Sequence, residues 1–288
     1  MSGPMGSRTV NQPIVGQPLL AYEGGDGSFP KPGELIEIRG GEALTQYDRT
    51  VFNLLIVNAW ETITEKKEHV IAKRLLRGNH DSTDRINETI DRLRSVQIEM
   101  RQTRDGKPGW YRDYILGPRF THDDPDGNLY YRFTDTVIEI ITKSDHWGRL
   151  QAQVMLAMTS KYSQALYEIV QKRAGLRGRF TETFELEALR AALGVPKGKM
   201  ERWQDFRRFC LEPAVAEVDA LSSCHVQVSP VKKGRAITHV ELRWFPKEED
   251  ALKEAAAEVK RHKVGRKARI AKKVDAVQLD LLGDEKKT

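Results

Sequence analysis

Apolar positions near the start of the chain repeat with the spacing of a helix. Thr45 precedes the repeat and has Asp48 three residues on, which is the arrangement of a helix N-cap. After a short extended stretch around residues 69–76, Ser82 caps a second predicted helix that runs to about Ser95. The apolar side of that helix carries Ile86, Ile90 and Leu93. These segments predict two amphipathic helices.

The repeat then changes to the alternation that is typical of strands. Residues 96–101 and 110–116 lie on either side of Asp105-Gly106, a pair that favours a hairpin turn. Two further strands and then a connecting helix are predicted beyond the hairpin, over residues 130–133, 137–141 and 145–158.

A similar order of elements begins again after residue 160. One helix follows Tyr162, and a second ends at Gly194 and Pro196. A third helix is predicted from near Lys199, with Pro213 kinking it or starting a new helical segment. Short strands are predicted at residues 180–184, 226–228 and 240–244.

Helices followed by a hairpin, twice along one chain, predict an α+β fold of two tandem winged-helix domains. The order of elements supports this repeat, without a repeat of individual residues. We expect a disordered leader at residues 1–33, rich in Gly, Pro, Gln and Ser, and a first domain at 34–144. A second, DNA-binding domain is expected at 145–246. Residues 247–288 are expected to form an exposed helix and a basic tail.

Composition narrows the class of protein. The 288 residues suit two small domains, and no apolar run approaches the roughly 20 residues that span a bilayer. The start of the chain lacks the apolar core of a signal peptide. The two cysteines, Cys210 and Cys224, form no Cys-x-x-Cys pair, which argues against a zinc site or a disulfide framework. We expect a cytoplasmic bacterial protein, associated with nucleoid or plasmid, with no cofactor, metal or membrane partner.

The net charge of +6 is distributed unevenly. Residues 260–273 contain eight basic residues and no acid, so the rest of the chain carries a net charge of −2. A DNA-binding body must therefore gather its positive charge on one face. The basic stretch itself either adds salt-sensitive affinity for DNA or keeps the chain in solution.

Two features of the second domain are candidates for binding DNA. Gly234 permits a tight hairpin tip, and the cations beside it can reach phosphates or enter the minor groove. The preceding helix supplies residues for the major groove, although Arg207 lies close to its apolar side. A solvated turn is the alternative for the hairpin. The candidate residues are Lys197, Lys199, Arg202, Arg207, Arg208, Lys232, Lys233 and Arg235.

The first domain offers a weaker set of candidates on its second helix. Acidic residues alternate with the cations there, as on an ordinary salt-bridged helix face. Direct DNA contact, partner binding and dimerisation all remain open for this domain. The candidates are Arg85, Asn87, Arg92 and Arg94, interleaved with Asp84, Glu88 and Asp91.

The segment from residue 162 to residue 245 resembles the C-terminal winged helix of iteron-binding plasmid replication initiators. The resemblance is carried by the residues from Leu186 to Val195, by Trp203-x-Asp205-Phe206-Arg207-Arg208 through Val218, and by the tip around Gly234. Cys210 stands where an aliphatic residue is expected, and Asp219 where Asn is common. The resemblance implies DNA contacts by Lys199, Arg202, Arg208, Lys232, Lys233 and Arg235.

The same resemblance implies a biological role. Such initiators bind repeated duplex sites at a plasmid origin, help to open an AT-rich segment and recruit the host initiator and helicase. Their dimers often repress their own gene, whereas their monomers initiate, so a monomer–dimer equilibrium is expected. The chemistry is binding and DNA deformation, with no covalent step and no catalytic residue.

The end of the chain is similar to the short peptide by which bacterial proteins bind the replicative sliding clamp. Two leucines would fill an apolar pocket and a glutamine would bond at its edge. Leu282 departs from the Phe that is usual at the last position, and an incidental apolar end is the alternative. The residues of this segment are Gln278, Leu279, Asp280, Leu281 and Leu282.

Two other functions compete with the initiator. A winged-helix transcriptional regulator without a replication role would also bind duplex DNA. A nicking nuclease would need metal ligands or a nucleophile, and no such motif occurs in the sequence. The acidic stretch at residues 123–128 favours a β-turn over a calcium loop, because His122 and Phe133 would fall on ligand positions. We therefore expect a binding protein and no enzyme.

Overall fold

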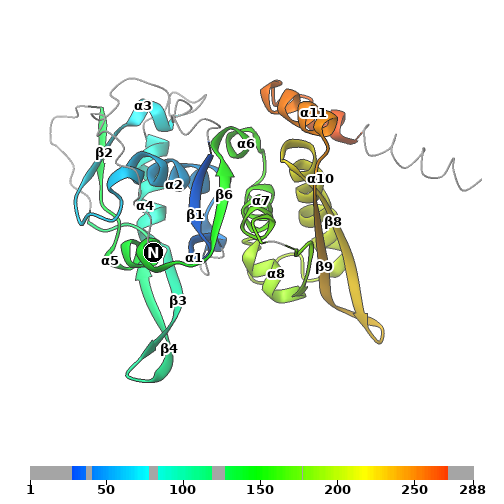
Figure 1. Cartoon of the computed structure of the whole chain (residues 1–288), viewed down its shortest axis with the longest axis horizontal. Helices are drawn as coiled ribbons and strands as arrows, with labels where there is room; N and C mark the ends of the chain where they lie inside the picture. The colour runs from blue at the N-terminus through cyan, green and yellow to red at the C-terminus, as the bar shows by residue number, and fades with distance from the viewer. Residues whose placement is uncertain (1–27, 37–40, 78–83, 119–126, 177, 272–288) are drawn as a thin grey trace, which may run out of the picture.

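The computed structural model describes residues 28–36, 41–77, 84–118, 127–176 and 178–271. Two bodies lie next to each other, with helix α7 (Lys161–Ala174) packed between them (Figure 1). Each body combines helices with small antiparallel sheets, which confirms the predicted α+β fold.

The first body is centred on helices α2 (Gln46–Ala59) and α4 (Asp84–Ser95), which pack against each other. Asp105 and Gly106, both with positive φ, form the turn of its predicted hairpin. The remaining elements are α1 (Gly33–Ile36), β2 (His69–Ala72), α3 (Lys73–Leu76), β3 (Gln97–Arg104), β4 (Lys107–Tyr114), β5 (Asn128–Tyr131) and α5 (Asp135–Lys143). Strand β2 pairs with β5, and β3 pairs with β4.

Helix α2 begins at the predicted cap. The Thr45 hydroxyl accepts a hydrogen bond from the Asp48 backbone N–H at 3.2 Å, and the Asp48 carboxylate accepts one from the Thr45 N–H at 2.8 Å. This reciprocal pair satisfies two of the N–H groups that a helix start leaves without partners.

Strand β1 (Ser28–Pro32) corrects the predicted leader. It pairs antiparallel with β6 (Trp147–Gln151), and Phe29 and Lys31 are buried. The prediction of disorder is therefore wrong for residues 28–33, and residues 1–27 lie outside the described residues. Pro30 and Pro32 fit this position because a two-stranded sheet has only edge strands, where a missing N–H is tolerated.

Two other predicted elements also differ. Residues 137–141, predicted as a strand, lie in helix α5, whose start is capped by the Thr134 hydroxyl accepting from the Val137 N–H. Their β-branched residues favour a strand locally, but burial of one helical face outweighs that preference. The predicted connecting helix at 145–158 is replaced by β6 and the shorter α6 (Ala152–Ala157).

The second body places helices against a three-stranded sheet of order β7-β9-β8. Trp244 and Leu242 of β9 and Phe206 are buried in its core. The strands are β7 (Thr181–Glu185), β8 (Cys224–Lys233) and β9 (Ala236–Pro246). The helices are α8 (Leu186–Ala192), α9 (Trp203–Phe206) and α10 (Glu212–Leu221), with a π-helical turn at Arg207–Leu211 between the last two.

A buried polar network joins the segments that meet at α7. Lys31 Nζ donates to Asn53 Oδ1 at 2.8 Å and to Glu168 Oε2 at 2.9 Å, and Asn53 Nδ2 donates to Glu168 Oε1 at 2.7 Å. The side chains of Lys31 and Glu168 are 3% and 1% exposed. Removing one partner of such a buried pair typically costs about 3–5 kcal/mol, because the other charge loses its compensation.

The C-terminal helix α11 (Glu249–Lys260) was expected to be exposed, but one face packs against α10 and α6. Ala255 and Glu258 are buried on that face. The predicted basic tail also begins with fixed residues, because Arg266 is only 2% exposed. We call residues 258–269 the C-terminal clasp.

The clasp binds the end of α6 and the residue that follows it. Arg266 donates to the Ala157 carbonyl and to Glu258 Oε1, and Lys263 Nζ donates to the Met158 carbonyl at 3.3 Å. Gln46 of α2 also donates to the Met158 carbonyl, at 3.1 Å. Cations at these last carbonyls of a helix stabilise its negative end. The clasp thereby fixes the start of the link between the two bodies.

Glu258 should make the clasp sensitive to acid. Hydrogen bonds from Arg269, and then from Arg266, lower the pKa of Glu258 to about 2. Because this pKa lies below that of the unfolded chain, the stabilisation is complete above about pH 4.5 and is lost as the pH falls toward 2. The free energy of unfolding in denaturant, measured between about pH 6 and pH 3, should therefore fall more steeply for the parent than for Glu258→Gln.

Glu249→Gln, which changes an exposed carboxylate on the same helix, is the control and should keep the parental slope. Equal slopes for the parent and Glu258→Gln would contradict the role of Glu258.

Candidate nucleic-acid interface

The hairpin formed by β8 and β9 extends beyond the body of the second domain (Figure 1). Gly234 forms its tip with a φ of +65°. Lys232, Lys233 and Arg235 are all exposed there, as the sequence predicts. A register shift between Val231 and Lys232 increases the local twist of the ribbon just before this tip. The three cations thus lie together at a free end of the sheet.

The helix that carries the predicted DNA contacts starts at a later residue than the sequence predicts. Helix α9 begins at Trp203, and Lys199 lies in the preceding turn, where its N–H donates to the Pro196 carbonyl at 3.0 Å. Gly198 has a φ of +79° in this turn. Lys197 and Lys199 are therefore exposed turn residues, next to the helix start. Arg202 is the exposed residue directly before the helix.

A π-helical turn changes the position of Arg207. The Glu212 N–H donates to the Arg207 carbonyl, five residues back, and Arg207 Nε pairs with Glu212 Oε1 at 3.1 Å. The interpretation that Arg207 lies close to the apolar side is wrong, because its side chain is 54% exposed. Arg208 and Phe209 are exposed as well. The guanidinium of Arg208 lies 5.3 Å from the centre of the Phe209 ring.

Aromatic packing anchors this helix beside the sheet. Phe206 is fully buried and meets Trp203 edge to face at 6.1 Å. Arg190 of α8 lies 5.1 Å from the Phe206 ring centre and donates to the Glu201 carbonyl at 2.7 Å. These contacts hold α8 and α9 in the relation of a helix-turn-helix. Trp203 and Phe206 thus anchor the helix to the core.

The buried thiol in this helix has no features of a nucleophile. Burial raises the pKa of Cys210 to about 12, so the thiol stays protonated at neutral pH. Cys210 is fully buried and fills the core position where the resemblance predicts an aliphatic residue. Within the ranges that the structure describes, no group of three or more His, Cys, Asp or Glu residues could hold a metal ion.

In the first body, Arg92 is a structural residue. Its Nε and Nη2 donate to the two oxygens of Asp48 at 2.9 Å each, and Thr89 donates to the same carboxylate at 2.8 Å. The Asp48 carboxylate is buried, and the bonds from Arg92 and Thr45 outweigh burial and lower its pKa. The donors of Arg92 are directed at the α2 cap, so this arrangement does not favour a DNA contact by Arg92, which stays a prediction.

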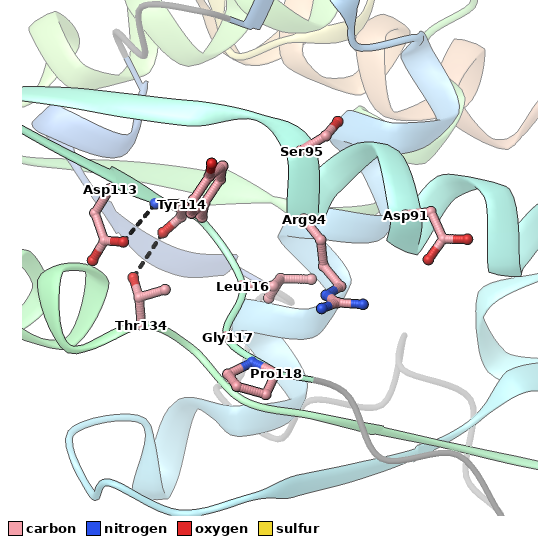
Figure 2. Close-up of a pocket in the computed structure, with 9 residues that line it drawn as sticks. All are labelled: Asp91, Arg94, Ser95, Asp113, Tyr114, Leu116, Gly117, Pro118 and Thr134. Atoms are coloured by element: carbon pink, nitrogen blue, oxygen red, sulfur yellow. Dashed lines mark hydrogen bonds between the residues drawn. The ribbon is translucent and has the colours of Figure 1, made fainter.

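Arg85 and Arg94 differ from Arg92. The Arg85 guanidinium lies 4.3 Å from the centre of the Tyr47 ring. Arg94 lines a shallow, open cavity of about 620 Å³ with Asp91 and Asp113, and Figure 2 shows its side chain beside Leu116. The other lining residues are Ser95, Tyr114, Gly117, Pro118 and Thr134. The mixed charges of this cavity give no specific indication of an anionic ligand.

Sequence reasoning missed exposed residues on the hairpin of the first body. Lys107, Tyr111 and Arg112 of β4 are exposed on the predicted β3–β4 hairpin. The same signal that selects the second hairpin, a Gly-containing tip with adjacent cations, was present here at Asp105-Gly106. Phe209 was also missed, because the sequence alone does not show which large apolar residues of a helix stay exposed.

Two family models match the chain. The model described as "Initiator Replication protein, WH1" matches residues 30–171, and the model described as "Initiator Rep protein, WH2" matches residues 185–244. The chain belongs to the initiator Rep family. Its two winged-helix domains follow the order of the family. The first match extends through β6, α6 and most of α7, beyond the boundary predicted at residue 144.

The Pi initiator protein shares the fold of this Rep chain, and a second solved structure is less similar. The Pi initiator protein, crystallised in complex with iteron DNA, is 16% identical, with a TM-score of 0.57, and the match covers 78% of this chain and 99% of that one. Domains 2 and 3 of RctB are 13% identical, with a TM-score of 0.43, and the match covers 76% and 86% of the two chains. No curated protein sequence matches this Rep chain.

Two further predictions concern the end of the chain and the membrane. Gln278–Leu282, the predicted clamp-binding segment, lies outside the described residues. No helix within the described ranges is long and apolar enough to cross a membrane.

Replacing Arg92 should separate stability from DNA binding. Arg92→Ala should lower the free energy of unfolding by about 1.5–3 kcal/mol, because the buried Asp48 carboxylate loses two charged hydrogen bonds. Chemical denaturation measures this loss. At temperatures where the variant stays folded, its affinity for duplex DNA should equal that of the parent.

Arg94→Ala, which removes the same charge two residues along the helix, should leave the stability nearly unchanged. A selective loss of duplex affinity in a fully folded Arg92→Ala protein would restore Arg92 as a DNA contact.

Proposed function

We propose that this initiator Rep protein starts plasmid replication by binding repeated duplex sites, or iterons, at the origin through its second winged helix. The observation that carries the proposal is the pairing of an exposed cationic helix with a glycine-tipped basic hairpin in one domain. The family matches support it, and the related Pi initiator fold has been crystallised with iteron DNA.

The two basic features have different roles in this proposal. We call α9 and the π-helical turn after it, residues 203–211, the recognition helix, and this helix enters the major groove. Arg202 directly before it and Arg207 and Arg208 within it would donate paired hydrogen bonds to guanine edges. Lys197 and Lys199, in the turn before the helix, contact phosphates. Lys232, Lys233 and Arg235 contact phosphates or the minor groove beside it. The helix would then determine which DNA sequence is bound, and the hairpin would fix the position of the protein along the duplex.

The first domain adds a second contact or a dimer interface. Its β3–β4 hairpin and the β8–β9 hairpin extend toward the same side of the molecule in Figure 1, which favours a shared duplex. The exposed Lys107 and Arg112 on β4, with Arg85 and Arg94 on α4, would supply its charges. In dimers the same surface would be occupied by a second chain, which relates the monomer–dimer equilibrium to initiation.

Opening of the origin and recruitment of host proteins complete the proposal. Binding at several adjacent repeats bends or untwists DNA, and flexible AT-rich steps open at the lowest cost. The protein would then recruit the host initiator and helicase, and its dimers would repress its own gene. Its place in the cell would be on the plasmid, in the nucleoid region. The chemistry involves no covalent step.

Neutralising the hairpin tests the proposal. The triple variant Lys232→Gln/Lys233→Gln/Arg235→Gln should bind the iteron duplex at least about tenfold more weakly at moderate salt, because three cationic side chains no longer contact the DNA phosphates. The slope of log K against log salt should fall by up to about 0.9 for each lost contact. Fluorescence anisotropy over a salt series measures both.

The control neutralises three exposed lysines elsewhere, Lys66, Lys143 and Lys253, which removes the same charge. It should keep the parental slope. If both triple variants lost the same affinity for the duplex, the effect would come from net charge alone. That result would contradict DNA binding by the hairpin.

A transcriptional regulator without a replication role would also bind such a duplex, and no comparison favours that function. The initiator and the regulator can be distinguished with a plasmid whose only origin is this gene with its adjoining repeats. An initiator maintains the plasmid in a host, and a regulator leaves it unreplicated.

The host sliding clamp is a proposed partner of Gln278–Leu282. A peptide of residues 274–288 should bind the purified clamp with micromolar affinity, and Leu281→Ala/Leu282→Ala should lower the affinity at least about tenfold, because the two side chains lose an apolar pocket. Surface plasmon resonance measures both peptides. Replacing Lys286 and Lys287 by Gln in the peptide is the control for charge. Equal binding by the leucine variant would remove the clamp as a partner of this segment.

A further inference from the structure

Phe209 is exposed in an unusual place for a large apolar side chain. Phe209 is 57% exposed, more than any other Phe or Tyr whose exposure the structure describes. It lies in the π-helical turn, between the buried anchors Phe206 and Cys210. The core of the second domain therefore does not use this ring.

The surroundings of Phe209 are those of the proposed DNA surface. Arg207 and Arg208 precede it and are exposed, and the Arg208 guanidinium lies 5.3 Å from the ring centre. Phe209 is six residues beyond Trp203, which is roughly 9 Å along a helix. That distance is less than the width of a major groove, roughly 12 Å, so the start of the helix and Phe209 fit one groove.

The chemistry of the major groove limits what this ring can contact. Base edges there present hydrogen-bond donors and acceptors, which an aromatic hydrocarbon cannot pair. The exception is the 5-methyl group of thymine, which is apolar and makes favourable contact with Phe. A solvent-exposed Phe on a helix that enters the groove thus has thymine as its matching base.

We propose that Phe209 recognises the 5-methyl group of a thymine in the binding site, while the adjoining Arg208 bonds a neighbouring guanine. The ring holds the guanidinium on one side, which limits its rotamers before binding and lowers the entropy lost on binding. This inference rests on the proposed function and specifies which bases the helix reads.

The other exposed phenylalanines of this domain lack these surroundings. Phe180 and Phe245 stack on each other, with ring centres 6.4 Å apart and planes 15° apart. They lie at the edge strand β7 and on β9, not on the recognition helix. Phe245 is therefore a matched control for the loss of an exposed ring.

The experiment uses the full chain and its own repeat. A footprint on DNA adjoining the gene, or selection from random duplexes, first gives the bound sequence. Each thymine of that sequence is then replaced singly by deoxyuridine, which removes only the 5-methyl group. Anisotropy titrations compare the parent, Phe209→Ala, Phe209→Leu and Phe245→Ala, and thermal melts check that each is folded.

We expect one or two thymines at which deoxyuridine lowers the affinity of the parent about three- to fivefold, the effect of losing one buried methyl. Phe209→Ala should bind the thymine and deoxyuridine duplexes equally, and Phe209→Leu should retain part of the difference. Phe245→Ala should behave as the parent. The double-mutant cycle isolates the contact between ring and methyl.

Two results overturn the inference in distinguishable ways. If the parent binds its repeat but no thymine position shows a difference that Phe209→Ala abolishes, Phe209 does not read thymine, and the proposed function stands. If the parent binds no duplex specifically, the proposed function fails first, and this inference fails with it.

Discussion

The buried contact between Lys31, Asn53 and Glu168 is the constraint on which the arrangement of this protein depends. Its three residues come from strand β1, helix α2 and helix α7, which are far apart in the sequence. Burial lowers the pKa of Lys31, and the neighbouring Glu168 opposes that shift. Because loss of one partner would leave the other charge buried with less compensation, the packing of the three segments depends on all three residues. The contact therefore favours one arrangement of β1, α2 and α7 over other ways of packing the same apolar residues.

Helix α7, which holds Glu168 of this contact, also packs against the second domain. One side of the helix packs against α2 and β6, and another packs against α10. The link just before α7 is held by a second set of contacts, in which Glu217 of α10 accepts from the Thr159 N–H at 2.9 Å and the clasp binds the preceding carbonyls. Helix α9 is continuous with α10 through the π-helical turn, so the packing of α10 on α7 sets the position of α9 relative to the first domain.

The sequence predicts the elements that local chemistry determines. The Thr45 cap, the Asp105-Gly106 turn and the β8–β9 hairpin all follow from residues a few positions apart. The cations around Gly234 were identified in the same way, and they are exposed at the hairpin tip.

The missed features depend on partners that are distant in the sequence. Strand β1 has the Pro-rich composition of a linker, and only pairing with β6 more than 100 residues away makes it a strand. Arg92 and Arg266 have the same appearance in the sequence as solvated cations, yet one bonds Asp48 and the other bonds Glu258 and Ala157. No local pattern distinguishes a charge that binds DNA from one that a folded chain has already neutralised.

The π-helical turn at Arg207–Leu211 has a consequence for how this helix can evolve. A π turn accommodates one residue more than an α-helical turn. Deletion of a single codon there would restore a regular α-helix and leave Trp203 and Phe206 in nearly the same orientation relative to α10, because the wide turn is what absorbs the extra residue. Only residues inside the turn would change face, and Arg207, Arg208 and Phe209 are among them. The set of side chains that this helix exposes can therefore change by loss of one residue while its buried anchors keep their positions.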